Sequence, residues 1–514
     1  MPVMSRLRQE TGGFAMIVVM GVMMVGGLLV AAAFAASNGD ISLARLDQDR
    51  RNAYAAAEAG LNVYTYHLSQ DNGYWARCTN VPPPSATEPS AVNNAWNGVG
   101  TDPRSWRALP GSTAQWSVEL MPANGYAQCS ESQAQPSMID QSTGTFRIRS
   151  TGRVGKAKRS IVGTFRRRSF IDYIYFTDFE TADPATYGSA SQVAWASANC
   201  SKWYRQGRSS SCTRIQFATD DVVAGPFHTN DDILTCGTPT FGRSPADVVE
   251  VSAPDPGYRT NCGAIVPDFQ GTWTTSAPTL TLPPSNATLN SIAGVRFTGT
   301  TKIVLNGANM TVTGPTGAVS TVPVPANGVV YVQSGSCGSS GYNITQTYNT
   351  PSGCGDAWVR GTTSQNITIA ADNDVIINGD VRRSGDVLVG LIANNFVRIY
   401  HPVTRTQSDI DNGDCTNATG TLTNVTVDAA ILALQHSFIV DNYYCGAKLG
   451  TLAVNGAIAQ KFRGAVGVSG SNNSGYTKSY NYDDRLRYRE PPSFLDPVHV
   501  AWRVVRQTEQ LPPR

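Results

Sequence analysis

A long apolar run close to the start of the chain constrains the fold more than any other feature. Residues 14–37 contain no charged side chain, and they follow a short leader that carries Arg6 and Arg8 and ends in Gly12 and Gly13. A helix needs about 20 apolar residues to cross a bilayer, and this run supplies them. Because basic residues stay on the cytoplasmic side, we expect the leader inside the cell and the rest of the chain outside.

Two simpler interpretations of the apolar run stay open. A cleaved secretion signal has an apolar core of roughly 7 to 15 residues and a small-x-small cleavage site. The AFA motif at residues 33–35 could mimic such a site, but the run is longer than such a core. In a plain single-pass anchor, Gly21, Gly26 and Gly27 would serve only to pack helices together.

The helix is expected to continue beyond the apolar run. No proline occurs between residues 41 and 70, and apolar side chains recur there at three- and four-residue steps: Leu43, Leu46, Tyr54, Ala57, Leu61, Tyr64 and Leu68. This spacing is typical of an amphipathic helix. We predict one helix over residues 14–68, membrane-spanning to about residue 37 and amphipathic after it, with a length of about 80 Å. Any bend is expected at Asn38 and Gly39.

The ten cysteines all follow the apolar run, and their number is even. No C-x-x-C motif occurs, and no histidine stands at a zinc-like spacing from a cysteine pair. This pattern favours disulfides formed outside the cytoplasm over metal ligation, with buried free thiols in a cytosolic protein as the alternative. Pairs that are close in sequence are preferred, Cys200 with Cys212 and Cys337 with Cys354. The ten disulfide candidates are Cys78, Cys129, Cys200, Cys212, Cys236, Cys262, Cys337, Cys354, Cys415 and Cys445.

The part of the chain after the helix is predicted to be mainly β. Gly (48) and Pro (29) are frequent, and long helical periodicity is absent after residue 70, which indicates short strands joined by turns. Lys+Arg (40) and Asp+Glu (38) nearly balance, so we expect no nucleic-acid partner. Residues 69–170 include three segments that alternate apolar and polar side chains, as antiparallel strands with one buried face do. We expect a small β-rich domain there.

Residues 171–480 are expected to form a β-solenoid body. Asn-Gly follows a β-like run at Asn306, Asn378 and Asn455, with Thr-, Val-, Ile- and Asn-rich segments between them. This recurrence favours stacked coils, and we predict a right-handed parallel β-helix from about 220 to 470, with a β-sandwich as the alternative. Residues 481–514 are expected to cap the last coil, because an open end would expose strand edges. The predicted fold class is therefore α+β, mainly β.

No arrangement of residues points clearly to catalysis. Neighbouring carboxylates could serve a polysaccharide-cleaving β-helix, but turns and ion pairs with arginine explain such residues as well. The three pairs are Asp372 with Asp374, Asp409 with Asp411, and Asp483 with Asp484. No P-loop, G-x-S-x-G or H-E-x-x-H motif is present. We therefore expect no catalytic residue, no metal and no cofactor, and a carbohydrate-active β-helix enzyme is the least favoured alternative.

The order of these N-terminal features resembles the type IV pilin and pseudopilin class. The shared features are a short basic leader, Gly13 followed by Phe14, an apolar half-helix and an amphipathic half-helix that carries a body. The resemblance implies that a prepilin peptidase cuts on the cytoplasmic face between Gly13 and Phe14, and that Phe14 is then methylated.

Four further stretches of sequence point to the PilX-type proteins within this class. The sequence AYAAAEAGLN at residues 53–62, which contains Glu58, is similar to the N-terminal region of PilX-type minor pilins. Residues 390–403, residues 430–443 and the charged, aromatic tail resemble the extracellular part of large PilX-related pilus assembly proteins. The resemblance implies no established chemistry for the body.

Val18 departs from the pattern of the pilins that build a filament shaft. Those pilins carry a Glu four residues after the new N-terminus, where this chain has Val18. Because that Glu neutralises a neighbouring terminal amine within an apolar bundle, a subunit without it leaves a costly unpaired charge in the shaft. Val18 and Glu58 are therefore the candidate assembly residues, and a tip or other minor position fits the chain better.

These observations together predict a non-catalytic minor pilin or pilus assembly subunit at or near the filament tip, with an adhesive body. The implied partners are other pilin subunits through the N-terminal helix, a prepilin peptidase, the membrane, and a surface or glycan ligand. The chain is expected in the cytoplasmic membrane before assembly and outside the cell after it. A membrane-anchored surface adhesin unrelated to pili is the alternative.

Overall fold

The computed structural model divides the chain into two compact units. Unit 1 comprises Met1–Asp140, Thr145–Arg166 and Trp502–Arg514, and unit 2 comprises Gln141–Gly144 and Arg167–Ala501. The structure describes residues 12–70, 74–77, 106–123, 126, 129, 137–140, 145–167, 169–219, 221–338, 351–404, 415–468, 473–487, 489–498 and 502–514, without the side chains of 12–14, 36–43 and 167.

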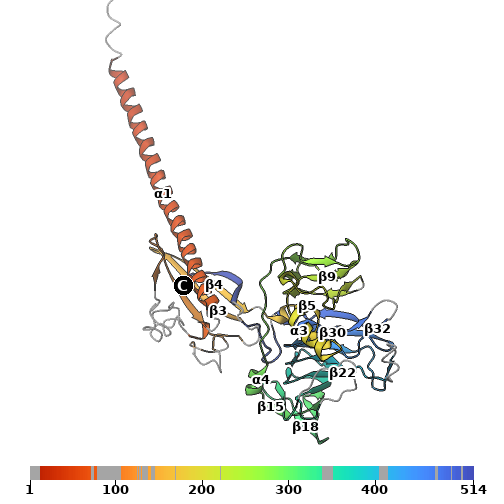
Figure 1. Ribbon diagram of the computed structural model, residues 1–514. Coiled ribbons are helices and arrows are strands. Elements are labelled where there is room, and N and C mark those ends of the chain that lie inside the picture. Colours follow the sequence, from red (N-terminus) through yellow and green to blue (C-terminus); the bar gives the residue numbers. More distant parts are fainter. Residues whose placement is uncertain are drawn as a thin grey trace, which may run out of the picture. The chain divides into compact units, whose positions relative to one another are not determined.

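Unit 1 consists of a long helix, α1 (Gly12–Gln70), and a five-stranded sheet (Figure 1). The strands, in their order across the sheet, are β1 (Arg107–Ala108), β2 (Gln115–Met121), β3 (Thr145–Val154), β4 (Ala157–Arg167) and β33 (Trp502–Gln510). Neighbours from β1 to β4 pair in antiparallel fashion, and a short helix, η1 (Tyr74–Arg77), follows α1. Since β33 comes from the end of the chain, unit 2 is inserted in the sequence between β4 and β33.

The second half of α1 packs on β2 and β3. Its buried side chains recur at helical spacing and include Ala53, Ala57, Leu61, Tyr64 and Leu68. The predicted amphipathic helix is thus present, and α1 stays helical through Asn38 and Gly39, where a bend was expected. Burial of the apolar stripe is the main source of its stability, because helical propensity alone contributes little.

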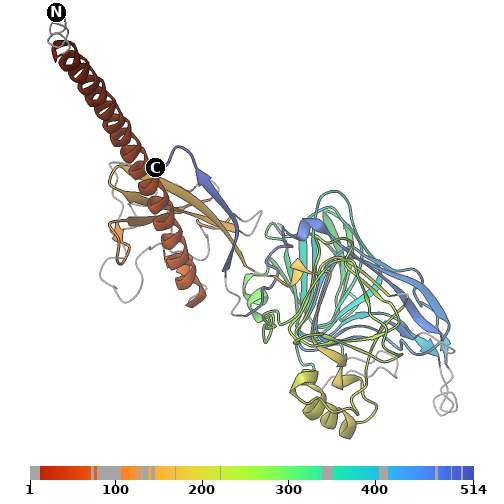
Figure 2. The ribbon, with the colours of Figure 1, turned by 90° about the horizontal axis from the view of Figure 1, so that it is seen from above.

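Unit 2 is dominated by a large curled sheet in which most neighbouring strands are parallel (Figure 2). One series of parallel strands runs, in spatial order, β15 (Val295–Thr298), β19 (Val329–Gln333), β21 (Ile367–Ala371), β23 (Val389–Ala393), β28 (Ala430–Ala433), β30 (Lys448–Arg463), β5 (Tyr175–Ala182), β8 (Phe227–Thr229), β11 (Val248–Val251) and β14 (Thr272–Thr274).

A second series of parallel strands accompanies the first. In spatial order it contains β16 (Thr301–Gly307), β20 (Ala357–Thr363), β22 (Val375–Arg383), β27 (Thr426–Val427), the first half of β30, β32 (Ser474–Tyr482), β7 (Val222–Ala224), β10 (Thr240–Phe241) and β13 (Asp268–Phe269). Two more parallel strands, β24 (Val397–Ile399) and β29 (Phe438–Val440), pair beside β22. The long strands β22 and β30 pass from one set of partners to another.

The remaining elements of unit 2 are short. A parallel three-stranded sheet contains β6 (Phe217–Ala218), β9 (Ile233–Cys236) and β12 (Tyr258–Thr260). Antiparallel pairs are formed by β17 (Asn309–Thr313) with β16 and β18 (Val319–Pro323), β25 (Val403–Thr404) with β26 (Thr416–Asn417), and β31 (Gly467–Val468) with β32. The helices are η2 (Phe170–Asp172), η3 (Pro184–Thr186), α3 (Ala190–Cys200), η4 (Tyr204–Gln206), α4 (Ala287–Ile292) and η5 (Asp484–Arg487).

Strands from the beginning and from the end of the body's sequence lie next to each other, in the middle of the stack of strands. Its first long strand, β5, pairs with β30, one of the last strands in the sequence, and β7 pairs with β32. In Figure 1, β5 and β30 lie side by side, while β9 lies toward one end and β15 and β18 toward the other. We call the two pairs β5–β30 and β7–β32 the junction, because they join the strands of residues 175–274 to those of residues 295–482.

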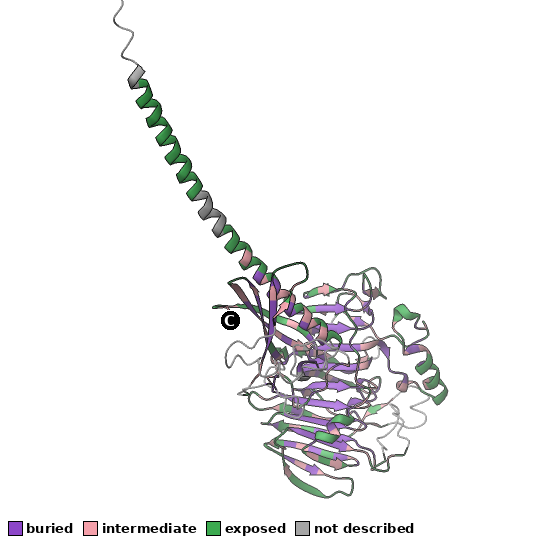
Figure 3. Cartoon of the chain, turned by 90° about the vertical axis from the view of Figure 1, so that its left-hand side faces the viewer, coloured by how far each residue is buried: buried purple, intermediate pink, exposed green. Residues whose placement is uncertain are grey.

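The core of unit 2 lies inside the curled sheet, where the strands carry buried side chains (Figure 3). Continuous buried runs such as β21 (Ile367–Ala371), β23 and β28 fit parallel strands that are covered on both faces. The prediction of a mainly β protein with an apolar N-terminal helix is confirmed. The parallel pairing differs from the antiparallel pairing of a β-sandwich.

The three Asn-Gly sites have two different roles. Asn306 pairs with Asn309 in the β16–β17 hairpin, where Gly307 has φ +62°. The other two sites lie within β22 and β30. A Cβ at Gly456, which follows Asn455, would overlap the Ala429 carbonyl oxygen, so the glycine permits close stacking of β30 on the preceding strand. The recurrence in the sequence therefore combines one hairpin with two positions inside long strands.

The tail, expected to cap the last coil as one segment over residues 481–514, is divided between the units. Residues 484–498 contain η5 and belong to unit 2, where Leu486 and Phe494 join the buried cluster. β33 belongs to unit 1 and extends its sheet. The two parts of the tail therefore pack in different cores.

Candidate functional site

The first half of α1 is an apolar surface in the described structure. The segment Ala15–Ala35 has a mean hydropathy of 2.5, with none of it buried in the chain's own fold. By length and composition it can cross a membrane. Val18 is 47% exposed, and added Cβ atoms at Gly21, Gly26 and Gly27 would contact nothing within 4 Å.

Two sequence-predicted processing residues lie at the start of this helix. Gly13 and Phe14 are within α1, but their side chains are outside the described set. Glu58, the second candidate assembly residue, is half-buried on the part of α1 that packs on the sheet. The structure therefore places Val18 and Glu58 on different halves of one helix, about 60 Å apart at 1.5 Å per residue.

Glycines let α1 approach its sheet closely. A Cβ at Gly152 of β3 would overlap the Ala53 carbonyl oxygen and lie 2.6 Å from the Ala57 nitrogen. A Cβ at Gly60 would lie 2.9 Å from a ring carbon of Trp116. Contacts below 3 Å are sterically excluded, so a side chain at either position would push the helix away from the sheet. The attachment of the apolar helix to the folded unit depends on these two glycines.

Four disulfides are present in the described part of unit 2. They join Cys200 to Cys212, Cys236 to Cys262, Cys337 to Cys354, and Cys415 to Cys445. The two pairs preferred from sequence proximity, Cys200–Cys212 and Cys337–Cys354, are confirmed. Cys129 is also disulfide-bonded, and Cys78 lies outside the described residues.

The candidate carboxylates that the structure describes are held by hydrogen bonds and ion pairs. Asp372 accepts hydrogen bonds from the Tyr331 hydroxyl and from the Ser334 nitrogen. Asp483 pairs with Arg383 at 3.2 Å and with Arg485 at 2.7 Å, and Asp484 pairs with Arg243 at 2.8 Å. Asp409 and Asp411 lie outside the described residues.

Asp374 belongs to a buried group of carboxylates around one guanidinium. Its Oδ2 lies 3.0 Å from Arg398 Nε, and Arg398 Nη1 lies 3.4 Å from Asp441. Asp356, also buried, accepts a hydrogen bond of 3.2 Å from the Asp374 nitrogen. Burial raises the pKa of Asp374 to about 6, with Arg398 acting in the opposite direction and the Asp356 charge raising it further. The Asp374 carboxyl group therefore retains its proton at mildly acidic pH.

The histidines of the body are dispersed and each has polar neighbours. His228 lies 2.9 Å from Glu250 and 3.1 Å from Asn230. His401 lies 2.9 Å from the Asp441 carbonyl oxygen, and His436 lies 3.0 Å from Asp183. His67 is on α1, and His499 is outside the described residues. Among the residues that the structure describes, no group of three His, Cys, Asp or Glu side chains could hold a metal ion.

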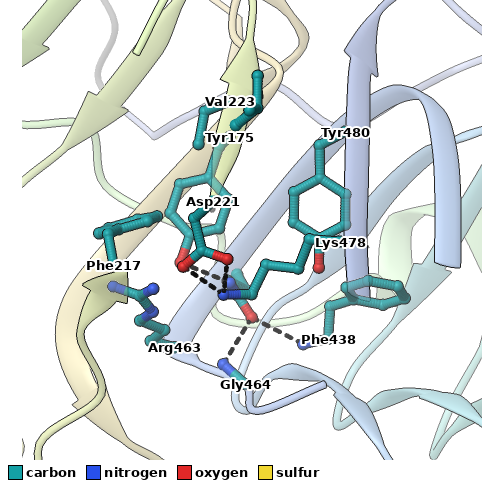
Figure 4. A pocket seen from close by; sticks show the side chains of 11 residues that line it. Tyr175, Phe217, Asp221, Val223, Phe438, Arg463, Gly464, Lys478 and Tyr480 are labelled. Carbon is teal, nitrogen blue, oxygen red and sulfur yellow. Dashed lines mark hydrogen bonds and ion pairs between the residues drawn. The ribbon is translucent and has the colours of Figure 1, made fainter. Parts of the chain in front are cut away.

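Buried polar side chains cross the junction. Arg463 of β30 pairs with Glu180 of β5 at 3.0 Å, and both side chains are at most 2% exposed. Lys478 of β32 pairs with Asp221 at 2.9 Å, and Gln460 donates to the Tyr175 hydroxyl at 3.2 Å. Figure 4 shows Tyr175, Asp221, Arg463 and Lys478 around a small pocket that Phe217 and Tyr480 also line.

The pocket at the junction is filled largely by its own polar groups. The Arg463 guanidinium lies 3.5 Å from the centre of the Phe217 ring, and Gln460 Oε1 accepts from the nitrogens of Phe438 and Gly464 at 2.9 and 3.2 Å. Burial raises the pKa of Glu180, and Arg463 acts against that shift. The chemistry of the pocket is thus that of a structural ion-pair network. Sequence reasoning did not find it, because its members are up to about 300 residues apart.

A segment that sequence reasoning also missed projects from the junction. Residues 183–216, which we call the disulfide lobe, contain η3, α3 and η4 and are closed by the Cys200–Cys212 bond. Of the residues of α3, only Ala196 and Cys200 are buried. The signal in the sequence is the absence of Asp and Glu from residue 184 to residue 219, a stretch that contains four Lys and Arg residues: Lys202, Arg205, Arg208 and Arg214.

The comparisons with known proteins do not assign the chain to a family. No protein-family model matches the chain, and no curated protein matches it by sequence. Among solved structures, the chain is similar to the crystal structure of the competence-associated pilin ComZ from Thermus thermophilus, with 12% sequence identity, coverage of 91% of this chain and 98% of that chain, and a TM-score of 0.26. A TM-score of this size does not establish a shared fold.

Proposed function

We propose that this chain is a non-catalytic minor pilin or pilus assembly subunit of a type IV pilus-like system. One observation carries the proposal: α1 begins as a fully exposed apolar segment and continues as an amphipathic helix that packs on an antiparallel sheet. A helix of this kind can leave the bilayer and pack against the apolar helices of other subunits while its folded unit stays outside. The order of Gly13, Phe14 and the apolar run supports the same assignment.

The finer features of the proposal follow from the sequence. The chain is a PilX-type subunit that a prepilin peptidase cleaves between Gly13 and Phe14, with methylation of Phe14. It occupies the tip or a position near it, because Val18 supplies no carboxylate for a neighbouring amine. Its partners are other pilin subunits, the peptidase and the membrane. It lies in the cytoplasmic membrane with its N-terminus inside before assembly, and on the pilus outside the cell afterwards.

We further propose that the body is a right-handed parallel β-helix that serves as the adhesive part. Two long series of parallel strands, with β30 passing from one series to the other, support stacked coils. Four disulfides among the described cysteines support a location outside the cytoplasm. A rigid, cross-linked body suits exposure at a filament end.

The test is the N-terminus of the membrane-extracted protein. We expect mass spectrometry to find a mature chain that starts at an N-methylated Phe14, and Gly13→Ala to block its formation. Immunogold labelling should mark filament ends. A mature chain that starts at Ala36, directly after the AFA motif at residues 33–35, would establish a secretion signal instead. An uncleaved chain distributed over the cell surface would establish the unrelated membrane-anchored adhesin.

A further inference from the structure

The disulfide lobe concentrates the body's unpaired cations. Most described Arg and Lys side chains of unit 2 are in ion pairs, among them Arg208 with Asp231 and Arg259 with Asp232. Lys202, Arg205 and Arg214 are exposed and have no carboxylate partner among the described residues. The other cations without a described ion pair are spread through the rest of the body: Arg296, Lys302, Arg360, Lys448 and Lys461.

Aromatic rings accompany these cations on the lobe. Trp195 is 39% exposed on α3, and Tyr204 is 44% exposed in η4. Among the described aromatic residues of unit 2, only Tyr444, at 36%, comes close to this exposure. An exposed Trp or Tyr offers a large apolar face at low cost in conformational entropy. Such residues are therefore enriched where proteins bind ligands.

The lobe holds these groups in place before any ligand arrives. The buried Asp231 accepts a 2.7 Å hydrogen bond from the Tyr204 nitrogen and also pairs with Arg208. The Arg205 guanidinium lies 4.2 Å from the centre of the Trp203 ring and donates to the Asn230 carbonyl oxygen at 2.6 Å. A guanidinium has five N–H donors, and fixing its plane in advance lowers the entropy cost of binding a carboxylate.

We propose that the disulfide lobe binds a polysaccharide that carries carboxylate groups. Apart from Asp183, which is buried and bonded to His436, the lobe has no acidic residue, so its charge complements an anionic chain. The three unpaired cations can each pair with one carboxylate along an acidic glycan. Nucleic acid fits less well, since proteins that bind it commonly contact about 6 to 10 phosphates. The Arg259 guanidinium lies 3.6 Å from the centre of the Tyr204 ring and covers one of its faces, so Trp195 is the aromatic residue of the lobe that best suits the apolar C–H face of a sugar ring.

This inference rests on the proposed function, because a pilus would carry the lobe to such a surface. The binding test uses the full chain in detergent micelles, with alginate as the polyuronate probe, dextran as the neutral glycan and double-stranded DNA as the competing polyanion. Wild-type protein should bind alginate, with little binding to dextran and weaker binding to DNA. Replacing Lys202, Arg205 and Arg214 together by Gln should weaken alginate binding about tenfold, since three exposed ion pairs each contribute modestly.

A matched variant removes the same charge elsewhere on the body. Lys302→Gln, Arg360→Gln and Lys448→Gln together replace three exposed cations outside the lobe, and we expect less than about a twofold effect because such charges act only at long range. Trp195→Ala keeps the charge of the lobe and should weaken binding about fivefold by removing an aromatic face. Intact mass under non-reducing conditions verifies that the Cys200–Cys212 bond persists in each variant.

Three results would overturn the inference. The first is that wild-type protein binds alginate no better than dextran. The second is that the two triple variants weaken alginate binding equally. The third is that the protein binds DNA more tightly than alginate, with the same dependence on the lobe. Immunogold labelling of the lobe variant separates the two proposals. Normal filament-end labelling with lost alginate binding supports the inference, and normal labelling with wild-type protein that does not bind alginate defeats the inference alone. Alginate binding by a chain absent from filaments would defeat only the proposed function.

Discussion

Asp374 shows how a single buried carboxyl group can make the body sensitive to pH. Its carboxylate shares Arg398 with Asp441, and Asp356 lies close by. Burial raises the pKa of Asp374 to about 6 from an ordinary 3.8. A group with a raised pKa binds its proton more tightly in the folded state. Its contribution to stability is therefore complete below about pH 4 and is lost as the pH rises through about 6.

We expect the body's free energy of unfolding to fall by about 1 kcal/mol between pH 5 and pH 7.5 because of Asp374. Asp374→Asn should remove this part of the pH dependence, as measured by urea unfolding at both pH values. The control is Asp380→Asn, since the side chain of Asp380 is 44% exposed. If the two variants kept the same pH dependence as the wild type, Asp374 would not be the titrating group.

Under the proposed function, Val18 is the residue on which the filament position depends. In a bundle of apolar helices, an unpaired terminal ammonium costs several kcal/mol even after relaxation. Val18→Glu should therefore raise the amount of this chain in sheared filaments about twofold or more, measured relative to the major subunit by quantitative mass spectrometry. Val19→Glu is the matched control, because it adds the same charge on another face of the helix. Uniform immunogold labelling of wild-type filaments would contradict the tip assignment.

At the scale of elements, the contact between α1 and its sheet decides whether the apolar helix is rigidly attached. β3 contributes Gly152 at the point of closest approach, beside the backbone of Ala53 and Ala57. Small residues on both sides let the helix and the strand approach closely, and Leu61, Tyr64 and Leu68 continue the buried stripe. A pilin-like subunit needs this attachment, because force on the body reaches the filament through the helix.

Gly152→Ala should destabilise unit 1 by about 1 to 3 kcal/mol, because its Cβ would overlap the helix backbone. The measurement is native-state hydrogen exchange, which should show faster exchange in residues 53–68 and in β2 and β3, with unit 2 unchanged. Gly314→Ala is the control, since a Cβ there has nothing within 4 Å. Unchanged protection of α1 in Gly152→Ala would show that the helix can shift without loss.

At the scale of the whole molecule, the chain path makes the junction the place where the body closes. β5 pairs with β30, which follows it by more than 250 residues in the sequence, and β7 pairs with the similarly distant β32. Backbone pairing alone would tolerate a shift in register, because it is nearly independent of side-chain identity. The buried pair Glu180–Arg463 and the partly buried pair Asp221–Lys478 add a requirement that only one alignment satisfies.

Arg463→Met should weaken the junction by about 3 to 5 kcal/mol, because it leaves Glu180 as an unpaired buried charge. Hydrogen exchange should report the loss at β5 and β30. The double variant Glu180→Met/Arg463→Met should recover most of it, since neither charge is then buried alone. Arg382→Gln, which breaks a surface pair with Asp380, should cost less than about 1 kcal/mol. Equal effects of Arg463→Met and Arg382→Gln would contradict the proposed role of the junction.

The sequence by itself determined the features that depend on near neighbours. The uncharged run at residues 14–37 and the stripe from Ala53 to Leu68 predicted the helix, because helical periodicity is a property of consecutive residues. The mainly β character after residue 70 and two short disulfide pairings, Cys200–Cys212 and Cys337–Cys354, were predictable for the same reason.

Only the tertiary structure decided how distant segments meet. The return of β33 to the first sheet, the pairing of β5 with β30 and the division of the tail depend on contacts between segments hundreds of residues apart. The burial of Glu180 with Arg463 and the exposed cations of the disulfide lobe depend on the same contacts. Strand pairing uses backbone groups that every residue possesses, so the sequence does not name the partner of a strand. The partner is selected when side chains from several strands fill one core.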